Sequence, residues 1–96
     1  MKVDDMVAVD LDGNVIEGKL KPSSDTLSHL YVYRHKSDVG GIIHTHSNFA
    51  TAFAAVGKPI PACLTTIVQN FGAGVPVGEY VPIGEEAIGL EIHQRY

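Results

Sequence analysis

The sequence has little of several residue types that define common protein classes. Its single cysteine, Cys63, excludes an internal disulfide framework and fits a reducing compartment. No apolar run approaches the roughly 18 residues of a membrane-spanning helix, and the N-terminal residues lack the apolar core of a signal peptide. The seven Lys and Arg residues are scattered through a chain of net charge −4, which argues against a nucleic-acid surface. We therefore expect a small cytoplasmic protein that binds neither nucleic acid nor membrane.

What is present is typical of one globular domain. Hydrophobic residues make up 45% of the chain and charged residues 19%, an ordinary balance for a folded protein. A length of 96 residues allows one domain with one core. We therefore expect residues 1–96 to belong to a single domain.

The N-terminal third predicts a hairpin followed by a helix. Residues 6–18 contain two short apolar runs around an Asp-Gly dipeptide, which is typical of a tight hairpin turn. Apolar residues then recur at helical spacing, which predicts a helix from residues 24–26 to residues 34–36. The apolar stripe of this helix is expected to consist of Leu27, Leu30 and Tyr31.

The rest of the chain alternates between strand and helix patterns. The expected elements are a strand at residues 40–46, a helix at 48–56, a strand at 62–68 and a last helix that begins at 84–86. Ser47 can cap the helix that follows it, and Gly57 can end that helix. Alternating elements of this kind predict a layered α/β fold, and the hairpin favours a mixed or mainly antiparallel sheet.

The strand expected at residues 40–46 ends in two histidines, His44 and His46. Because successive side chains of a strand point to opposite faces, these two would share one face, about 7 Å apart. Two imidazoles on one face can bind the same metal ion. Ordinary solvated or hydrogen-bonded histidines would have the same spacing, so the motif alone leaves both interpretations open.

A polar segment, Ser23-Ser24-Asp25, precedes the first expected helix. A helix N-terminus offers free N–H groups and partial positive charge, which favour an anion such as phosphate, and two serine hydroxyls can add donors. A plain helix cap with solvated serines is the simpler alternative. Together with His44 and His46, Asp25 would complete a set of two nitrogens and one oxygen that suits Zn²⁺ or a similar ion.

These motifs together resemble the class II aldolase and adducin family. The similar segments are residues 21–26 (KPSSDT), residues 40–47 (GGIIHTHS), residues 60–62 (IPA) and the Thr-Thr pair at 65–66. The resemblance runs from about residue 4 to at least residue 92 and is strongest to the sugar-phosphate 4-epimerases of the family. It covers the middle of a longer family domain, so we expect a truncated three-layer α/β/α fold.

The resemblance also implies a function and the residues that perform it. It implies a metal-dependent sugar-phosphate epimerase or aldolase that cleaves a C–C bond by a retro-aldol step through a metal-stabilised enediolate. His44 and His46 would bind a divalent metal ion, most simply Zn²⁺, and Asp25 would be a further metal-site residue and the candidate catalytic residue. Ser23 and Ser24 would contact the phosphate of the sugar. Family members also form ring-shaped assemblies, which implies a homo-oligomer.

Two departures from the family pattern leave a second interpretation open. Gln69 stands where the epimerases carry an acidic residue, and a carboxamide cannot transfer a proton at neutral pH. The third metal-binding histidine of the family lies further along its domain, and His93 does not match that motif. The alternative to an active enzyme is a catalytically silent metal-binding domain, or an assembly domain like the adducin head.

Overall fold

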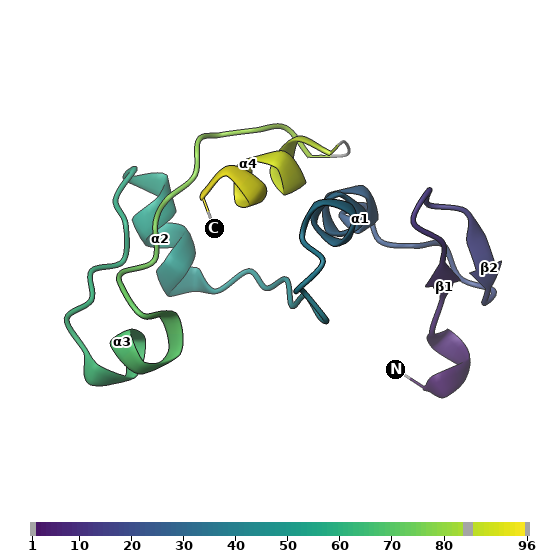
Figure 1. The fold of residues 1–96 in the computed structure, drawn as a ribbon, viewed down its shortest axis with the longest axis horizontal. Helices are drawn as coiled ribbons and strands as arrows, with labels where there is room; N and C mark the ends of the chain where they lie inside the picture. Colours follow the sequence, from purple (N-terminus) through teal and green to yellow (C-terminus); the bar gives the residue numbers. More distant parts are fainter. Residues whose placement is uncertain (1, 84–85, 96) are drawn as a thin grey trace. The chain divides into compact units, whose positions relative to one another are not determined.

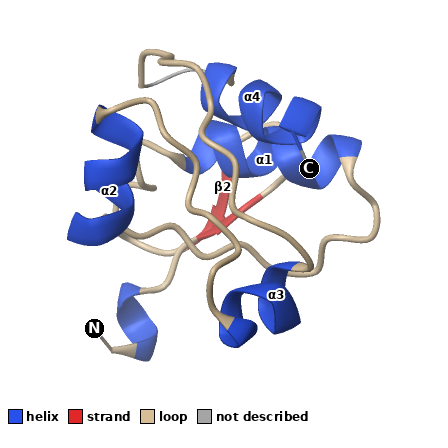
Figure 2. Cartoon of the chain, turned by 90° about the vertical axis from the view of Figure 1, so that its left-hand side faces the viewer, coloured by secondary structure: helices blue, strands red, loops and turns tan. Residues whose placement is uncertain are grey.

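The computed structural model describes residues 2–83 and 86–95, which divide into two compact units (Figure 1). The first unit comprises Met1–Ile42 and Tyr80–Gln94, and the second comprises Ile43–Glu79 with Arg95. In chain order the elements are a 3₁₀-helix η1 (Val3–Asp5), strands β1 (Ala8–Val9) and β2 (Val15–Glu17), and helices α1 (Thr26–His35), α2 (Asn48–Ala55), α3 (Thr65–Phe71) and α4 (Ala87–Arg95) (Figure 2). No helix within the described residues is long and apolar enough to cross a bilayer.

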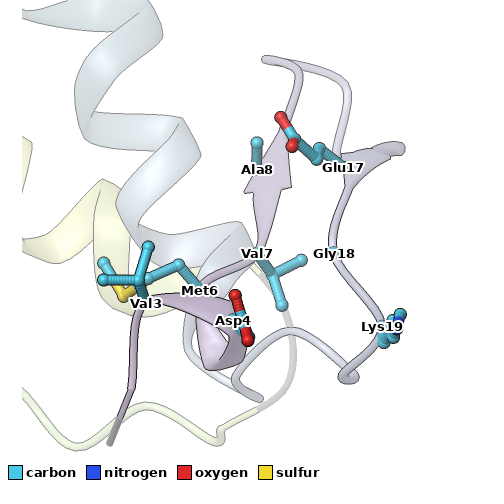
Figure 3. Close-up of a pocket in the computed structure, with 8 residues that line it drawn as sticks. All are labelled: Val3, Asp4, Met6, Val7, Ala8, Glu17, Gly18 and Lys19. Carbon is cyan, nitrogen blue, oxygen red and sulfur yellow. The ribbon is translucent and has the colours of Figure 1, made fainter.

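The predicted hairpin is confirmed in the first unit. Strands β1 and β2 pair antiparallel, with Ala8 opposite Glu17 and Val9 opposite Val15, so the register shifts between these two pairs. A pocket lies against the hairpin, and Figure 3 shows the charged side chains of Asp4, Glu17 and Lys19 among its lining residues. None of the site residues predicted from the sequence lines this pocket.

The turn between the two strands is held by Asp10, which sequence reasoning did not single out. Its carboxylate accepts hydrogen bonds from the backbone N–H groups of Asp12 at 3.0 Å and Asn14 at 2.8 Å, and from the Asn14 side chain at 2.9 Å. These bonds favour the ionised form and lower the pKa of Asp10, the side chain of Asn14 having the largest effect. Gly13 follows with a φ of 89°, a conformation that glycine adopts without strain.

Helix α1 supplies most of the core of the first unit. Leu30 and Val32 are each 5% exposed, and Ser28 is 3% exposed. The extent of the predicted helix is confirmed, but its predicted apolar stripe is only partly right. Leu30 is buried as expected, whereas Leu27 remains 37% exposed and the polar Ser28 is buried instead. The reason is the close approach of a second helix.

Helix α4 lies directly against α1 at Gly89. A Cβ atom at Gly89 would lie 2.5 Å from the carbonyl oxygen of Ser28 and 2.7 Å from the Cβ of Tyr31, so only glycine fits there. Arg34 on α1 adds a second link, because it forms an ion pair with Glu86 just before α4. Residues 84 and 85, where the last helix was expected to begin, lie outside the described residues.

Three aromatic rings extend the contact between α1 and α4. The rings of Tyr31 and His35 stack with centroids 4.0 Å apart, and the His93 ring lies 5.6 Å from that of His35. The Nδ1 atom of His35 lies 2.8 Å from the Tyr31 carbonyl oxygen. His35 is exposed and His93 is half-buried, and both rings belong to one cluster between the two helices.

The second unit contains α2 and α3, and it corrects two predictions. Residues 40–46 were expected to form a strand, but they have no regular secondary structure. Residues 62–68 were also expected to form a strand, yet α3 spans Thr65–Phe71 and is capped by Gly72, whose φ is 71°. Extended pairing in this unit is limited to an isolated antiparallel bridge between Ile60 and Val75. Within residues 2–83 and 86–95 the strands form one two-stranded sheet, so these residues do not build the layered mixed sheet expected from the sequence.

The contact at Gly89 leads to a prediction about stability. In an exposed helix, replacing glycine by alanine stabilises by up to about 1 kcal/mol. For Gly89→Ala we expect the opposite sign, a loss of about 1–3 kcal/mol, because the added methyl group would overlap the backbone of Ser28. Urea unfolding followed by circular dichroism measures the change. Gly41→Ala is the matched control, since a Cβ there meets no atom within 4 Å and should shift stability by less than about 0.5 kcal/mol.

The turn at Asp10 leads to a prediction about pH. Because its pKa is lower in the folded state than the ordinary value of 3.8, the hydrogen bonds of Asp10 stabilise the fold above that pH. This contribution should be lost as the pH falls below 3.8 towards the folded-state pKa. In an NMR titration we expect the carboxyl of Asp10 to titrate below 3.8, and Asn14→Ala to raise the midpoint. A midpoint that Asn14→Ala leaves unchanged would contradict the assigned cause.

Candidate functional site

The two histidines of the His-Thr-His motif lie together in the second unit. The Nε2 atoms of His44 and His46 are 3.2 Å apart. Their rings are stacked, with centroids 5.0 Å apart and an angle of 29° between the planes. The irregular backbone of this segment, rather than a strand, brings the two imidazoles together. Both residues are exposed, so an ion or a small molecule can reach them.

The start of helix α2 fixes the backbone beside this pair. Ser47 caps the helix, and its hydroxyl oxygen accepts a hydrogen bond from the N–H of Ala50 at 3.5 Å. His46 is therefore the residue immediately before the cap. The predicted cap and the predicted helix are confirmed, with α2 ending at Ala55, two residues before Gly57.

The spacing of the two nitrogens can be compared with what one metal ion requires. Histidine nitrogens lie about 2.0–2.1 Å from a bound Zn²⁺, so at tetrahedral angles two of them are about 3.3–3.4 Å apart. The observed Nε2–Nε2 distance of 3.2 Å is close to that value. Imidazole nitrogen is also a common ligand type for zinc and similar ions. The pair therefore fits two positions of one coordination shell.

The Ser-Ser-Asp segment lies at the start of α1 in the first unit. Asp25 is the N-cap residue of α1, but its side chain makes no capping hydrogen bond. The cap is closed instead through Ser23, whose hydroxyl oxygen accepts from the Asp25 N–H at 3.2 Å and whose carbonyl oxygen accepts from the Thr26 N–H at 3.1 Å. Ser23 and Ser24 are exposed and Asp25 is half-buried. The Asp25 carboxylate is thus not committed to the helix cap.

The predicted site residues fall into two groups, one in each unit. Ser23, Ser24 and Asp25 belong to the first unit, and His44 and His46 belong to the second. Within the described part of the chain, no three side chains among His, Cys, Asp and Glu form a group that could hold a metal ion. A pocket in the second unit lies along α2, which contributes Ala50, Thr51, Phe53 and Ala54 to its lining, and neither histidine lines it.

Gln69, which the family resemblance singled out as a departure from the epimerases, lies on α3. It is exposed, on a helix of seven residues. The strand expected at residues 62–68 would have ended just before Gln69, whereas the residue lies within a helix. An amide in this position can donate and accept hydrogen bonds but cannot act as an acid or base.

Comparison with known proteins identifies the family. The sequence matches the class II aldolase and adducin N-terminal domain over residues 1–96. The chain therefore belongs to the class II aldolase and adducin family.

The relatives within this family include enzymes of sugar-phosphate chemistry. L-ribulose-5-phosphate 4-epimerases UlaF from Salmonella paratyphi B, Salmonella paratyphi A and Salmonella typhi are each 53% identical to the chain over 76 residues. The match covers 79% of this chain and 33% of each epimerase, so the chain spans about a third of the length of these relatives. A solved structure of an L-fuculose 1-phosphate aldolase superposes with a TM-score of 0.84 at 35% identity, covering 95% of this chain and 42% of that one. The fold is thus that of part of a class II aldolase.

Proposed function

We propose that the chain binds a divalent metal ion, most simply Zn²⁺, through Nε2 of His44 and Nε2 of His46. The observation that carries this proposal is the distance of 3.2 Å between the two nitrogens, which suits two ligands of one ion. Solvent exposure of both rings supports it, because an open metal site needs access for a further ligand. Asp25 is proposed as an additional oxygen ligand, since its carboxylate is not used to cap α1.

The proposed substrate class is a sugar phosphate, which the names of the relatives support. Ser23 would bind the phosphate group. Its oxygen accepts the Asp25 N–H, which orients the hydroxyl and leaves its proton to donate. Ser24 would add a second hydroxyl, and the N-terminal end of α1 would add partial positive charge. Holding the phosphate away from the reacting bond orients the sugar.

The proposed reaction is retro-aldol cleavage of a C–C bond, completed either as an epimerisation or as an aldolase reaction. A divalent ion bound at the site would supply Lewis-acid polarisation of the sugar carbonyl oxygen. Asp25 is the residue of the proposed set that can accept and return a proton, because Gln69 cannot. We place this activity in the cytoplasm, in keeping with the single unpaired cysteine.

A second candidate is a metal-binding domain without turnover, including an adducin-like assembly role. The observation that favours it is Gln69, because an enzyme that depended on an acidic group there would lack its proton-transfer residue. Metal binding and catalysis therefore need separate tests.

The first test measures metal binding. Isothermal titration of the metal-free chain with Zn²⁺ should give one site per chain. Removing a residue that only hydrogen-bonds to a metal ligand lowers metal affinity by about 10- to 100-fold. His44→Ala and His46→Ala each remove a proposed ligand itself, so each should lower zinc affinity by at least that factor. Asp25→Asn should weaken zinc binding less than either histidine variant, because the Nε2 atoms of His44 and His46 remain.

A histidine outside the proposed site serves as the control. His35→Ala removes an imidazole whose Nδ1 faces the Tyr31 carbonyl oxygen and should leave zinc affinity unchanged. Equal zinc binding by His44→Ala and the unmodified chain would rule out the proposed ligands.

The second test measures turnover by the zinc-loaded chain. L-ribulose 5-phosphate and L-fuculose 1-phosphate are offered in turn, and NMR detects C4 inversion or release of an aldehyde. We expect Asp25→Asn to abolish turnover, and Ser23→Ala to raise KM more than it lowers kcat, because Ser23 contacts the non-reacting phosphate. Stoichiometric zinc without any turnover would instead support the second candidate.

A further inference from the structure

The ring cluster between α1 and α4 contains two titratable side chains that the proposed function does not use, His35 and His93. Their ring centroids lie 5.6 Å apart, and the ring of Tyr31 stacks on His35 and lies 6.2 Å from His93. All three residues belong to the first unit. Because the cluster joins the two helices, a change in the charge of either imidazole acts directly on their contact.

The two imidazoles have different surroundings. The Nδ1 atom of His35 donates to the Tyr31 carbonyl oxygen at 2.8 Å, so a further proton would add to Nε2 of an exposed side chain. The Nδ1 atom of His93 is buried and has no hydrogen-bond partner within the described residues. A proton there would bury an N–H group of a charged ring without an acceptor, which costs free energy. The contact between the helices therefore favours a neutral His93.

A proton on His35 acts in the same direction. His35 lies in the last turn of α1 with Arg34, and the partial negative charge of a helix C-terminus favours an imidazolium there. That charge would repel a second one on His93, because 5.6 Å is shorter than the screening length of about 8 Å at physiological salt. The phenol of Tyr31 stays uncharged between pH 5 and 8, so it does not offset the repulsion.

The carboxylates carried by α4, or paired with its neighbourhood, do not offset this charge either. Glu86 pairs with Arg34. Glu79 pairs with Arg95 at 3.9 Å. Glu91 lies two positions before the α4 histidine, a spacing at which side chains of a helix do not face each other. In the described part of the chain, none of these three carboxylates is thus placed to stabilise a proton on that histidine.

We propose that the ring cluster is a pH-dependent clamp, which holds α4 on α1 while His93 is neutral and releases α4 when His93 gains a proton. Histidine changes its charge between about pH 5 and 8, so release would begin near neutral pH. Released α4 exposes His93 to water, where the ring takes up a proton more readily than in the contact. Since the released state binds more protons, the contact weakens as the pH falls.

Amide hydrogen exchange, measured by NMR on the 96-residue chain at about pH 7.5 and about pH 5, tests the clamp. After correction for the intrinsic pH dependence of exchange, the protection of α4 amides should fall at least about tenfold at the lower pH. His93→Phe keeps a ring in the cluster that cannot gain a proton, so this variant should abolish the fall. His35→Gln removes the repelling charge at an exposed position and should reduce the fall.

His44→Gln is the matched control, because it removes an exposed histidine of the second unit and should keep the fall in full. The amides of α2 report any general effect of acid. The proposal is overturned if α4 has no protection at pH 7.5, if α2 loses protection equally, or if His44→Gln removes the fall. A fall that persists unchanged in His93→Phe also overturns it. If His93→Phe does not fold, His35→Gln decides, and an undiminished fall in that variant has the same consequence.

Discussion

The arrangement of the first unit depends on one guanidinium group, that of Arg34. One nitrogen, Nη1, donates to the Leu11 carbonyl oxygen at 2.6 Å, and the other, Nη2, pairs with the carboxylate of Glu86. The planar fork of arginine can hold two such partners at once, which a lysine ammonium does less well. A single side chain on α1 thereby joins the hairpin turn to the segment that leads into α4. Since the pair is partly exposed, its main effect is to fix geometry rather than to add much stability.

This geometry matters because α1 carries the Ser-Ser-Asp segment at its other end. The helix is fixed near its C-terminus by Arg34 and along its length by the contact of Ser28 with Gly89. Its N-terminal cap uses the Ser23 hydroxyl and leaves the Asp25 carboxylate available. A rigid helix with an uncommitted carboxylate at its start is a suitable support for a binding residue.

Local sequence signals predicted some elements well and missed others for identifiable reasons. The hairpin and α2 were predicted because turn and cap residues, Asp-Gly and Ser47, act on their own neighbours. Helix α3 was missed because the β-branched pair at 65–66 favoured a strand, although the spacing of Leu64, Val68 and Phe71 and the following Gly72 were helical signals. The burial of Ser28 was missed because it depends on Gly89, more than 60 positions away in the sequence.

The sequence predicted that His44 and His46 lie close together, and they do. The backbone that brings them together differs from the predicted one. The expected strand would hold the two side chains about 7 Å apart at their backbones. The irregular segment before α2 instead lets the nitrogens approach to 3.2 Å, closer to the separation within one coordination shell. The proposed metal site would therefore depend on two neighbouring nitrogens beside a capped helix, whereas the proposed proton transfer would depend on a carboxylate elsewhere in the chain. Because the carboxamide of Gln69 lies apart from the histidines in the sequence, the two proposed properties can be tested separately.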